Sequence, residues 1–134
     1  MSHMTLEYSG NLREGGKFDE LCRKLSQCMV SLKIGEAPVF PPGGVRVRAI
    51  PCDDFCIADG SLSDAAFVHA ILKIGAGRSD AAKQGTAGGL FDIMKAHFAE
   101  IYSRRGLALS LELSEFSEAG TLKHNNLHAR FNKT

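Results

Sequence analysis

The sequence AFVHAILKIGAGRS, residues 66–79, predicts a strand that passes through a glycine turn into a helix. Its first part, Ala66–Ile74, is an apolar run rich in extended-chain formers, which is typical of a strand buried on both faces. Glycines interrupt the run, and Ser79 is placed to cap a helix that starts at Asp80. Backbone N–H groups at such a helix start, together with Arg78, would form a binding site for a carboxylate or phosphate. The alternative is a tight turn that leaves Arg78 on the surface.

The segments on either side repeat a pattern of strand, helix and strand. In chain order, the apolar spacing predicts a strand over 4–8, a helix over 18–32, a strand over 45–50, the strand over 66–74, a helix from 80 to 105 and a strand over 107–113. Two such units with right-handed crossovers make a four-stranded mixed sheet with both helices on one face. We therefore expect an α+β fold in a single domain, residues 1–134.

One layer of helices leaves apolar residues of this sheet uncovered. The leucines of 107–113 and the two-sided apolar run of 66–74 cannot all be covered by two helices, so the pattern predicts oligomerisation. Gly85, Gly88 and Gly89 suggest that another backbone approaches the second helix closely. The tail, residues 121–134, is expected to form a short strand or hairpin.

Composition excludes several classes of function. The formal net charge is +1 and no run of Lys or Arg occurs, so neither a nucleic-acid nor a membrane partner is indicated. No apolar stretch is long enough for a membrane span or a signal peptide, which favours a cytoplasmic protein. The four cysteines lack the spacing of a zinc site, so no metal is expected.

The strand over 45–50 carries two arginines on one face. Val45, Val47 and Ala49 alternate with Arg46 and Arg48, so the two guanidinium groups point the same way. By itself this pattern is typical of a solvated face, because charged side chains are mostly exposed.

Several blocks of the chain are similar to one family. EYSGNL, PPGGVRVR, ADG followed by AFVHAILKIGAGRS, KAHFAEI, LALSLEL and NNLHARF occur in order over nearly the whole sequence. In these blocks the chain resembles the 5-carboxymethyl-2-hydroxymuconate isomerases of the tautomerase superfamily. The resemblance implies two βαβ units with pseudo-twofold symmetry that assemble as a homotrimer.

The resemblance also implies a function and a site. The family interconverts an unsaturated dicarboxylate enol and its keto isomer in homoprotocatechuate catabolism, without metal or organic cofactor. An N-terminal proline amine is the general base, and arginines hold the substrate carboxylates. By position, Arg46 and Arg78 match substrate-binding arginines, and Arg48 matches a second arginine of the same strand. With this match, we interpret these arginines as functional residues rather than as part of a solvated surface.

Ser2 stands where the family has its proline, which is a departure from the pattern. If Met1 is removed, Ser2 presents a primary amine, whose pKa of about 7.8 makes it a usable base near neutral pH. If Met1 is retained, the Ser2 nitrogen is an amide and cannot take a proton. His3 is adjacent and is a candidate to line the site.

Two functions from different classes remain open. The first is a cofactor-independent keto–enol isomerase with Ser2 as the catalytic residue. The alternative is a tautomerase-like trimer without isomerase activity, which binds an anionic metabolite because Ser2 replaces the proline. The state of the mature N-terminus discriminates between the two.

Overall fold

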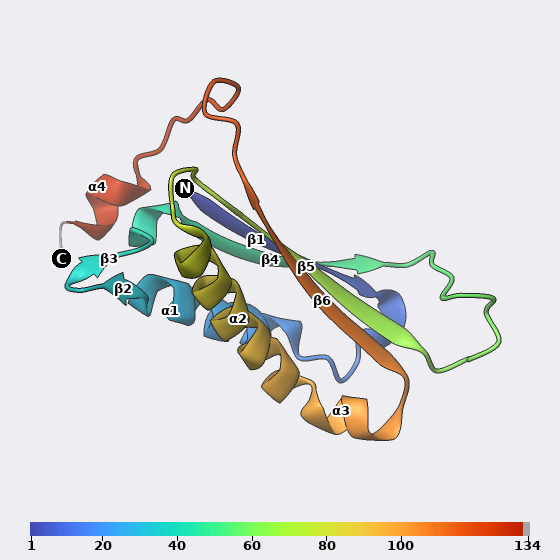
Figure 1. Ribbon diagram of the computed structural model, residues 1–134. Helices are drawn as coiled ribbons and strands as arrows, with labels where there is room; N and C mark the ends of the chain where they lie inside the picture. Colours follow the sequence, from blue (N-terminus) through green and yellow to red (C-terminus); the bar gives the residue numbers. More distant parts are fainter. Residues whose placement is uncertain (133–134) are drawn as a thin grey trace.

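A twisted four-stranded sheet forms one layer of the computed structural model, which describes residues 1–132, and two long helices pack against one of its faces (Figure 1). β1 runs parallel to β4, β5 runs parallel to β6, and the two central strands, β1 and β5, are antiparallel. This arrangement confirms the predicted α+β class and the mixed sheet. The strands, in their order across the sheet, are β4 (Val45–Cys52), β1 (Ser2–Ser9), β5 (Ala66–Ile74) and β6 (Leu107–Glu115).

Each parallel pair of strands is joined by a helical crossover. The helix α1, Phe18–Ser31, connects β1 to β4 and lies where its apolar spacing places it. The helices α2, Asp80–His97, and α3, Ala99–Arg104, connect β5 to β6. As predicted, Ser79 caps α2, since its hydroxyl accepts a hydrogen bond from the backbone N–H of Ala82 at 3.1 Å. The short elements are η1 (Gly10–Leu12), β2 (Lys33–Ile34), β3 (Ala37–Pro38), η2 (Pro42–Gly44) and α4 (Leu127–Phe131).

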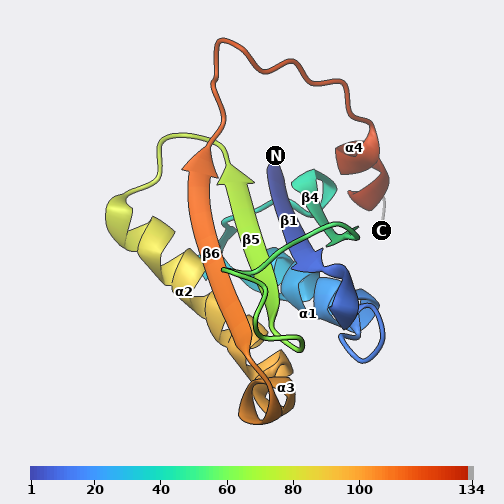
Figure 2. The ribbon, with the colours of Figure 1, turned by 90° about the vertical axis from the view of Figure 1, so that its right-hand side faces the viewer.

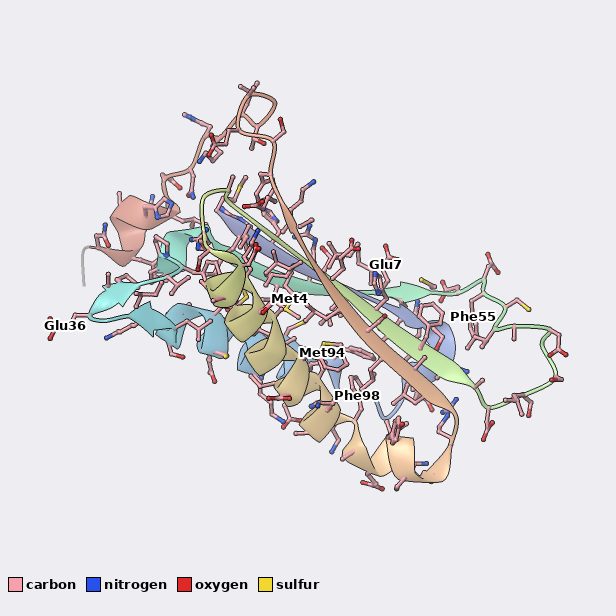
Figure 3. The ribbon with its side chains drawn as sticks, in the orientation of Figure 1. Met4, Glu7, Glu36, Phe55, Met94 and Phe98 are labelled. Carbon is pink, nitrogen blue, oxygen red and sulfur yellow. The ribbon has the colours of Figure 1, made fainter. Side chains whose placement is uncertain are left out.

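The hydrophobic core lies between the sheet and the helices. Met4 and Leu6 of β1, Met94 of α2 and Phe98 at its C-terminal end are fully buried. Figure 3 shows Met4, Met94 and Phe98 in this layer, whereas Glu7 projects from the other side of the sheet. The alternation of β1 therefore separates a buried face from an open one.

The open face of the sheet corrects one prediction. In β5, the side chains of Val68 and Leu72 are buried against the helices, but Phe67 and Ile71 are only half-buried and Lys73 is exposed. The expectation that residues 66–74 are buried on both faces is therefore wrong for the single chain. The reason is that both crossover helices lie on the same side of the sheet.

The strand register brings four chain segments to one end of the sheet. Ser2 pairs with Val45, the first residue of β4, and with Ile74, the last residue of β5. Ile74 in turn pairs with Glu115, the last residue of β6. The start of the chain, the start of β4 and the ends of β5 and β6 therefore meet at the same end, which lies at the top of Figure 2.

The tail differs from its prediction. After β6 it crosses this end of the sheet as an irregular segment and finishes in α4, beside β4 rather than as a strand or hairpin (Figure 2). The last two residues of the expected tail, 133 and 134, lie outside the described part of the chain. α4 packs against η2, where the backbone of His128 lies so close to Gly43 that an added Cβ would be 2.6 Å from the His128 nitrogen. Only glycine fits this contact.

Two further observations concern the helices. Gly85, Gly88 and Gly89 are exposed, and a Cβ added to any of them would meet no atom within 4 Å, so the expected close approach of a backbone does not occur within the chain. Among the described residues, no helix combines the length and the apolar character that a membrane crossing requires.

Candidate functional site

The start of β1 forms the centre of the candidate site. Ser2 is 2 % exposed and its hydroxyl donates a hydrogen bond to the carbonyl oxygen of Gly44 at 3.4 Å. Met1 lies outside it and lines two neighbouring cavities of about 480 and 310 Å³. With Met1 in place, the free α-amine of the chain therefore belongs to Met1, one residue beyond the position predicted for the base.

This amine lies in a positively charged environment. Burial lowers the pKa of the Met1 α-amine below its ordinary value, and the positive charges of Lys123, Arg78 and Arg46 lower it further. A lower pKa makes more of the amine neutral near pH 7, which is the form that can accept a proton. The same charges attract anions, so a base and an anion-binding surface coincide here.

Arg46 lines the larger of the two cavities together with Met1 and His3. Its guanidinium donates a hydrogen bond to the carbonyl oxygen of Gly44 at 3.3 Å and keeps its other donors for a ligand. β4 holds Arg46 beside His3 because these two residues are partners in the parallel register.

Arg78, like Arg46, is half-buried, and it contacts two backbone carbonyls and an aromatic ring. Its guanidinium donates to the carbonyl oxygens of Gly75 at 3.0 Å and Val39 at 2.8 Å, and it lies over the buried ring of Phe40 at 5.0 Å. Arg78 therefore ties the turn after β5 to the connection before β4. Its side chain is half-buried, so the alternative of a surface arginine does not hold.

Arg48 lies in a separate cavity on the open face of the sheet, of about 460 Å³, which His3 also lines. Its guanidinium is 2.9 Å from His3 Nδ1. Because an arginine can only donate, Nδ1 is the acceptor and the ring proton is on Nε2. Burial lowers the pKa of His3, and Arg48, Arg46 and the N-terminal amine lower it further, so His3 is neutral near pH 7.

The tail contributes residues that the sequence pattern did not single out. Lys123, His124, Asn125 and His128 line the larger cavity together with Met1 and Arg46. Asn125 fixes the tail, because its side-chain amide donates to the carbonyl oxygen of Gly43 at 3.0 Å. Asn125 and His128 belong to the NNLHARF block, which was one of the blocks that carry the family resemblance. Its local pattern does not show which strand ends this segment approaches.

A larger cavity elsewhere has a different character. It measures about 580 Å³ and lies between α2, α3 and the edge strand β6, lined mainly by apolar side chains with Lys95 as its one cation. Tyr102 of α3 is 65 % exposed and borders this groove. Within residues 1–132, no group of three or more His, Cys, Asp or Glu side chains is placed to hold a metal ion.

The arrangement at the start of β1 suits acid–base chemistry on an anion. An amine with a lowered pKa can take a proton, the surrounding cations can hold carboxylates, and they stabilise negative charge that develops as the proton leaves. Of the residues predicted for the site, Ser2 and Arg46 lie here, and Arg78 acts on the amine through its charge although it lines neither cavity. Arg48 belongs to the adjoining cavity and reaches the site only through His3.

Comparison with known proteins finds relatives that match the chain over almost its whole length. The family model described as 5-carboxymethyl-2-hydroxymuconate isomerase matches residues 2–131. The 5-carboxymethyl-2-hydroxymuconate Delta-isomerase of Escherichia coli is 39% identical over 131 residues, covering 98% of this chain and 99% of the relative. The crystal structure of a 5-carboxymethyl-2-hydroxymuconate isomerase from Deinococcus radiodurans R1 matches with a TM-score of 0.89 and 46% identity, covering 97% of this chain and 93% of that one.

A more distant structure shares the fold alone. A fused 4-OT protein, described as a symmetric trimer, matches with a TM-score of 0.60 at 14% identity and covers 91% of this chain and 93% of its own. The double βαβ arrangement is therefore found well beyond the range of close sequence similarity.

Proposed function

Because the chain belongs to the 5-carboxymethyl-2-hydroxymuconate isomerase family of the tautomerase superfamily, we propose that it is a cofactor-independent keto–enol isomerase. Its substrate is an unsaturated enol of aromatic-compound catabolism that carries at least two carboxylates, of the type formed from homoprotocatechuate. The chain acts as one domain in the cytoplasm, without a nucleic-acid or membrane partner.

In this proposal the base is the α-amine at the start of β1, supplied by Ser2 once Met1 is removed. The neutral amine accepts the proton of the enol hydroxyl, and the negative charge moves into the conjugated chain. The resulting ammonium then returns the proton to carbon, which yields the keto isomer. Arg46 binds a carboxylate, and the charge of Arg78 behind it stabilises the dienolate.

One observation carries this proposal: at the start of β1, burial and then the charges of Lys123, Arg78 and Arg46 lower the pKa of the Met1 amine, and the Ser2 amine formed by removal of Met1 would lie one residue further into the same surroundings. A solvated N-terminus would have neither the lowered pKa nor the cationic surroundings.

The direct test is an assay with 5-carboxymethyl-2-hydroxymuconate, on protein whose N-terminus has been defined by intact mass. We expect the ultraviolet absorbance of the conjugated dienol to fall much faster with protein than in buffer. A small panel of other enol and keto acids then defines the substrate range. Progress curves equal to buffer, for protein with and without Met1, would refute the isomerase.

A second candidate follows from the buried Ser2 position. If Met1 is retained, the amine is displaced by one residue, about 3.3 Å along an extended strand. A base must lie within hydrogen-bond distance of the proton that it takes, so such a protein would bind anions without catalysis. In this case the assay is negative, while a dicarboxylate still binds to the arginines.

We also expect a homotrimer. The open sheet face leaves Phe67 and Ile71 half-buried, and the groove beside β6 is lined mainly by apolar side chains, so a single chain leaves apolar surface for a partner to cover. Light scattering coupled to size exclusion should give three times the chain mass of 14.5 kDa. A monomer at micromolar concentration would contradict this expectation.

A further inference from the structure

The tail forms one wall of the site, although it is far from β1 in sequence. It leaves β6 at the end of the sheet where β1 begins and crosses to the far edge strand, β4 (Figure 2). Two contacts fix it there: the hydrogen bond from Asn125 to the carbonyl of Gly43, and the packing of His128 on the same glycine. The segment between β6 and these contacts therefore stays above the amine.

Lys123 is the cation that this segment carries. It lines both cavities that Met1 lines, and it shares the larger one with Arg46. Among the described residues it forms no ion pair, so its ammonium group remains available to a ligand. Burial lowers the pKa of the Met1 amine and the charge of Lys123 lowers it further, in agreement with the place of both residues on the same two cavities.

The chemistry of the proposed substrate class gives this cation a partner. Muconate has a carboxylate at each end of its chain, and the carboxymethyl substituent adds a third. Three cations act at the amine: Arg46 and Lys123 line the larger cavity, and Arg78 contributes its charge from outside the cavity lining.

We propose that Lys123 is a specificity-determining residue that binds the third carboxylate, so that the site selects tricarboxylates over otherwise equal dicarboxylates. This inference rests on the proposed function, because it assigns a further substrate group to the same site. In this orientation one end of the conjugated chain lies toward Arg46, and the branch lies toward the tail.

Binding of two inert probes tests the inference without turnover. Tricarballylate and glutarate share a five-carbon dicarboxylate chain, and only tricarballylate has the additional carboxylate. By calorimetry, we expect the parent protein to bind tricarballylate about tenfold more tightly than glutarate, as for one charge-assisted contact at a partly exposed site. Lys123→Gln should reduce this preference to less than threefold. Lys33→Gln, which removes an equally charged exposed side chain of β2, should preserve it.

A second variant displaces Lys123 without removing its charge. Gly43→Ala puts a Cβ at 2.6–2.7 Å from the backbone of His128, so α4 and the tail must move. The tenfold preference should fall as it does in Lys123→Gln, while circular dichroism shows the fold intact. Gly88→Ala, whose added Cβ meets no atom within 4 Å, is the matched control and should keep the preference.

The outcomes separate this inference from the function on which it rests. A preference that is absent in the parent, or unchanged in both Lys123→Gln and Gly43→Ala, overturns the role of Lys123. A parent that binds neither probe overturns it as well. If the tricarboxylate preference behaves as expected but no enol is isomerised, the inference on binding holds and the isomerase is refuted instead.

Discussion

Changing Ser2 to proline, in protein from which Met1 has been removed, should raise turnover of a 2-hydroxymuconate-type substrate by about a hundred- to ten-thousandfold over parent protein that retains Met1. This is the usual contribution of a positioned general base. The KM should change little, because the arginines and the pocket remain the same. The reason for so large an effect is position: in the parent, the free amine belongs to Met1, while the Ser2 nitrogen is an amide at the buried strand start.

Parent protein with Met1 removed is the matched control for this change. Its Ser2 amine is a usable base, so the gain from proline should be smaller against this control. Acetylation of the N-terminus should abolish turnover in all three proteins. Full activity after acetylation would exclude the amine as the base. A parent that is inactive without Met1, together with no gain from proline, would favour the anion-binding alternative.

The pH dependence gives a second measurement of the same base. The base works in its unprotonated form, so kcat/KM should rise as pH increases through the pKa of the amine. The midpoint of this rise should lie below the ordinary α-amine value of about 8, because burial and the nearby cations, which lower the pKa of the Met1 amine, act at the same place. Loss of one of these cations, as in Lys123→Gln, raises the pKa and should move this limb to higher pH. A limb that stays in place would show that another group titrates.

Replacing Arg46 with alanine should raise the dissociation constant for a dicarboxylate by about ten- to a hundredfold. One charge-assisted hydrogen bond to a carboxylate is worth roughly 1.5–3 kcal/mol. Arg46 has a single backbone partner, the Gly44 carbonyl, so its removal should affect binding with little loss of stability. Calorimetry for binding and thermal unfolding for stability measure the two effects separately.

Arg78→Ala should lose binding to a similar extent and should also lose stability. Its guanidinium links the Gly75 and Val39 carbonyls, and without it two half-buried acceptors lose their donors, at a cost of about 1–3 kcal/mol. Arg23→Ala, on the exposed face of α1, is the control for removing one positive charge. A change in binding below twofold for both Arg46→Ala and Arg78→Ala would mean that these side chains do not hold the substrate.

The sequence by itself determined the elements and the residue types of the site. The periodicities of α1, β4 and β6, and the cap at Ser79, are local properties, because side-chain spacing and backbone hydrogen bonding act over a few residues. The alternation of residues 45–50 placed Arg46 and Arg48 on one face of a strand. The strand–turn–helix junction after β5 placed Arg78 near a predicted anion-binding site. The sequence pattern could not show that β5 has only one buried face, because that depends on which side both helices take.

Only the tertiary structure decided which of these residues meet. The register of β1 with its two neighbours brings the amine to the start of β4 and the end of β5, and no local pattern contains that pairing. The tertiary structure also separates Arg48 from Arg46, because the guanidinium of Arg48 lies against His3 in a different cavity. It also placed Lys123 on the cavities that Met1 lines. The tail has no regular periodicity, so its position depends on a contact with Gly43, more than eighty residues away in the chain. The missing Cβ of Gly43 leaves room for α4 at this contact.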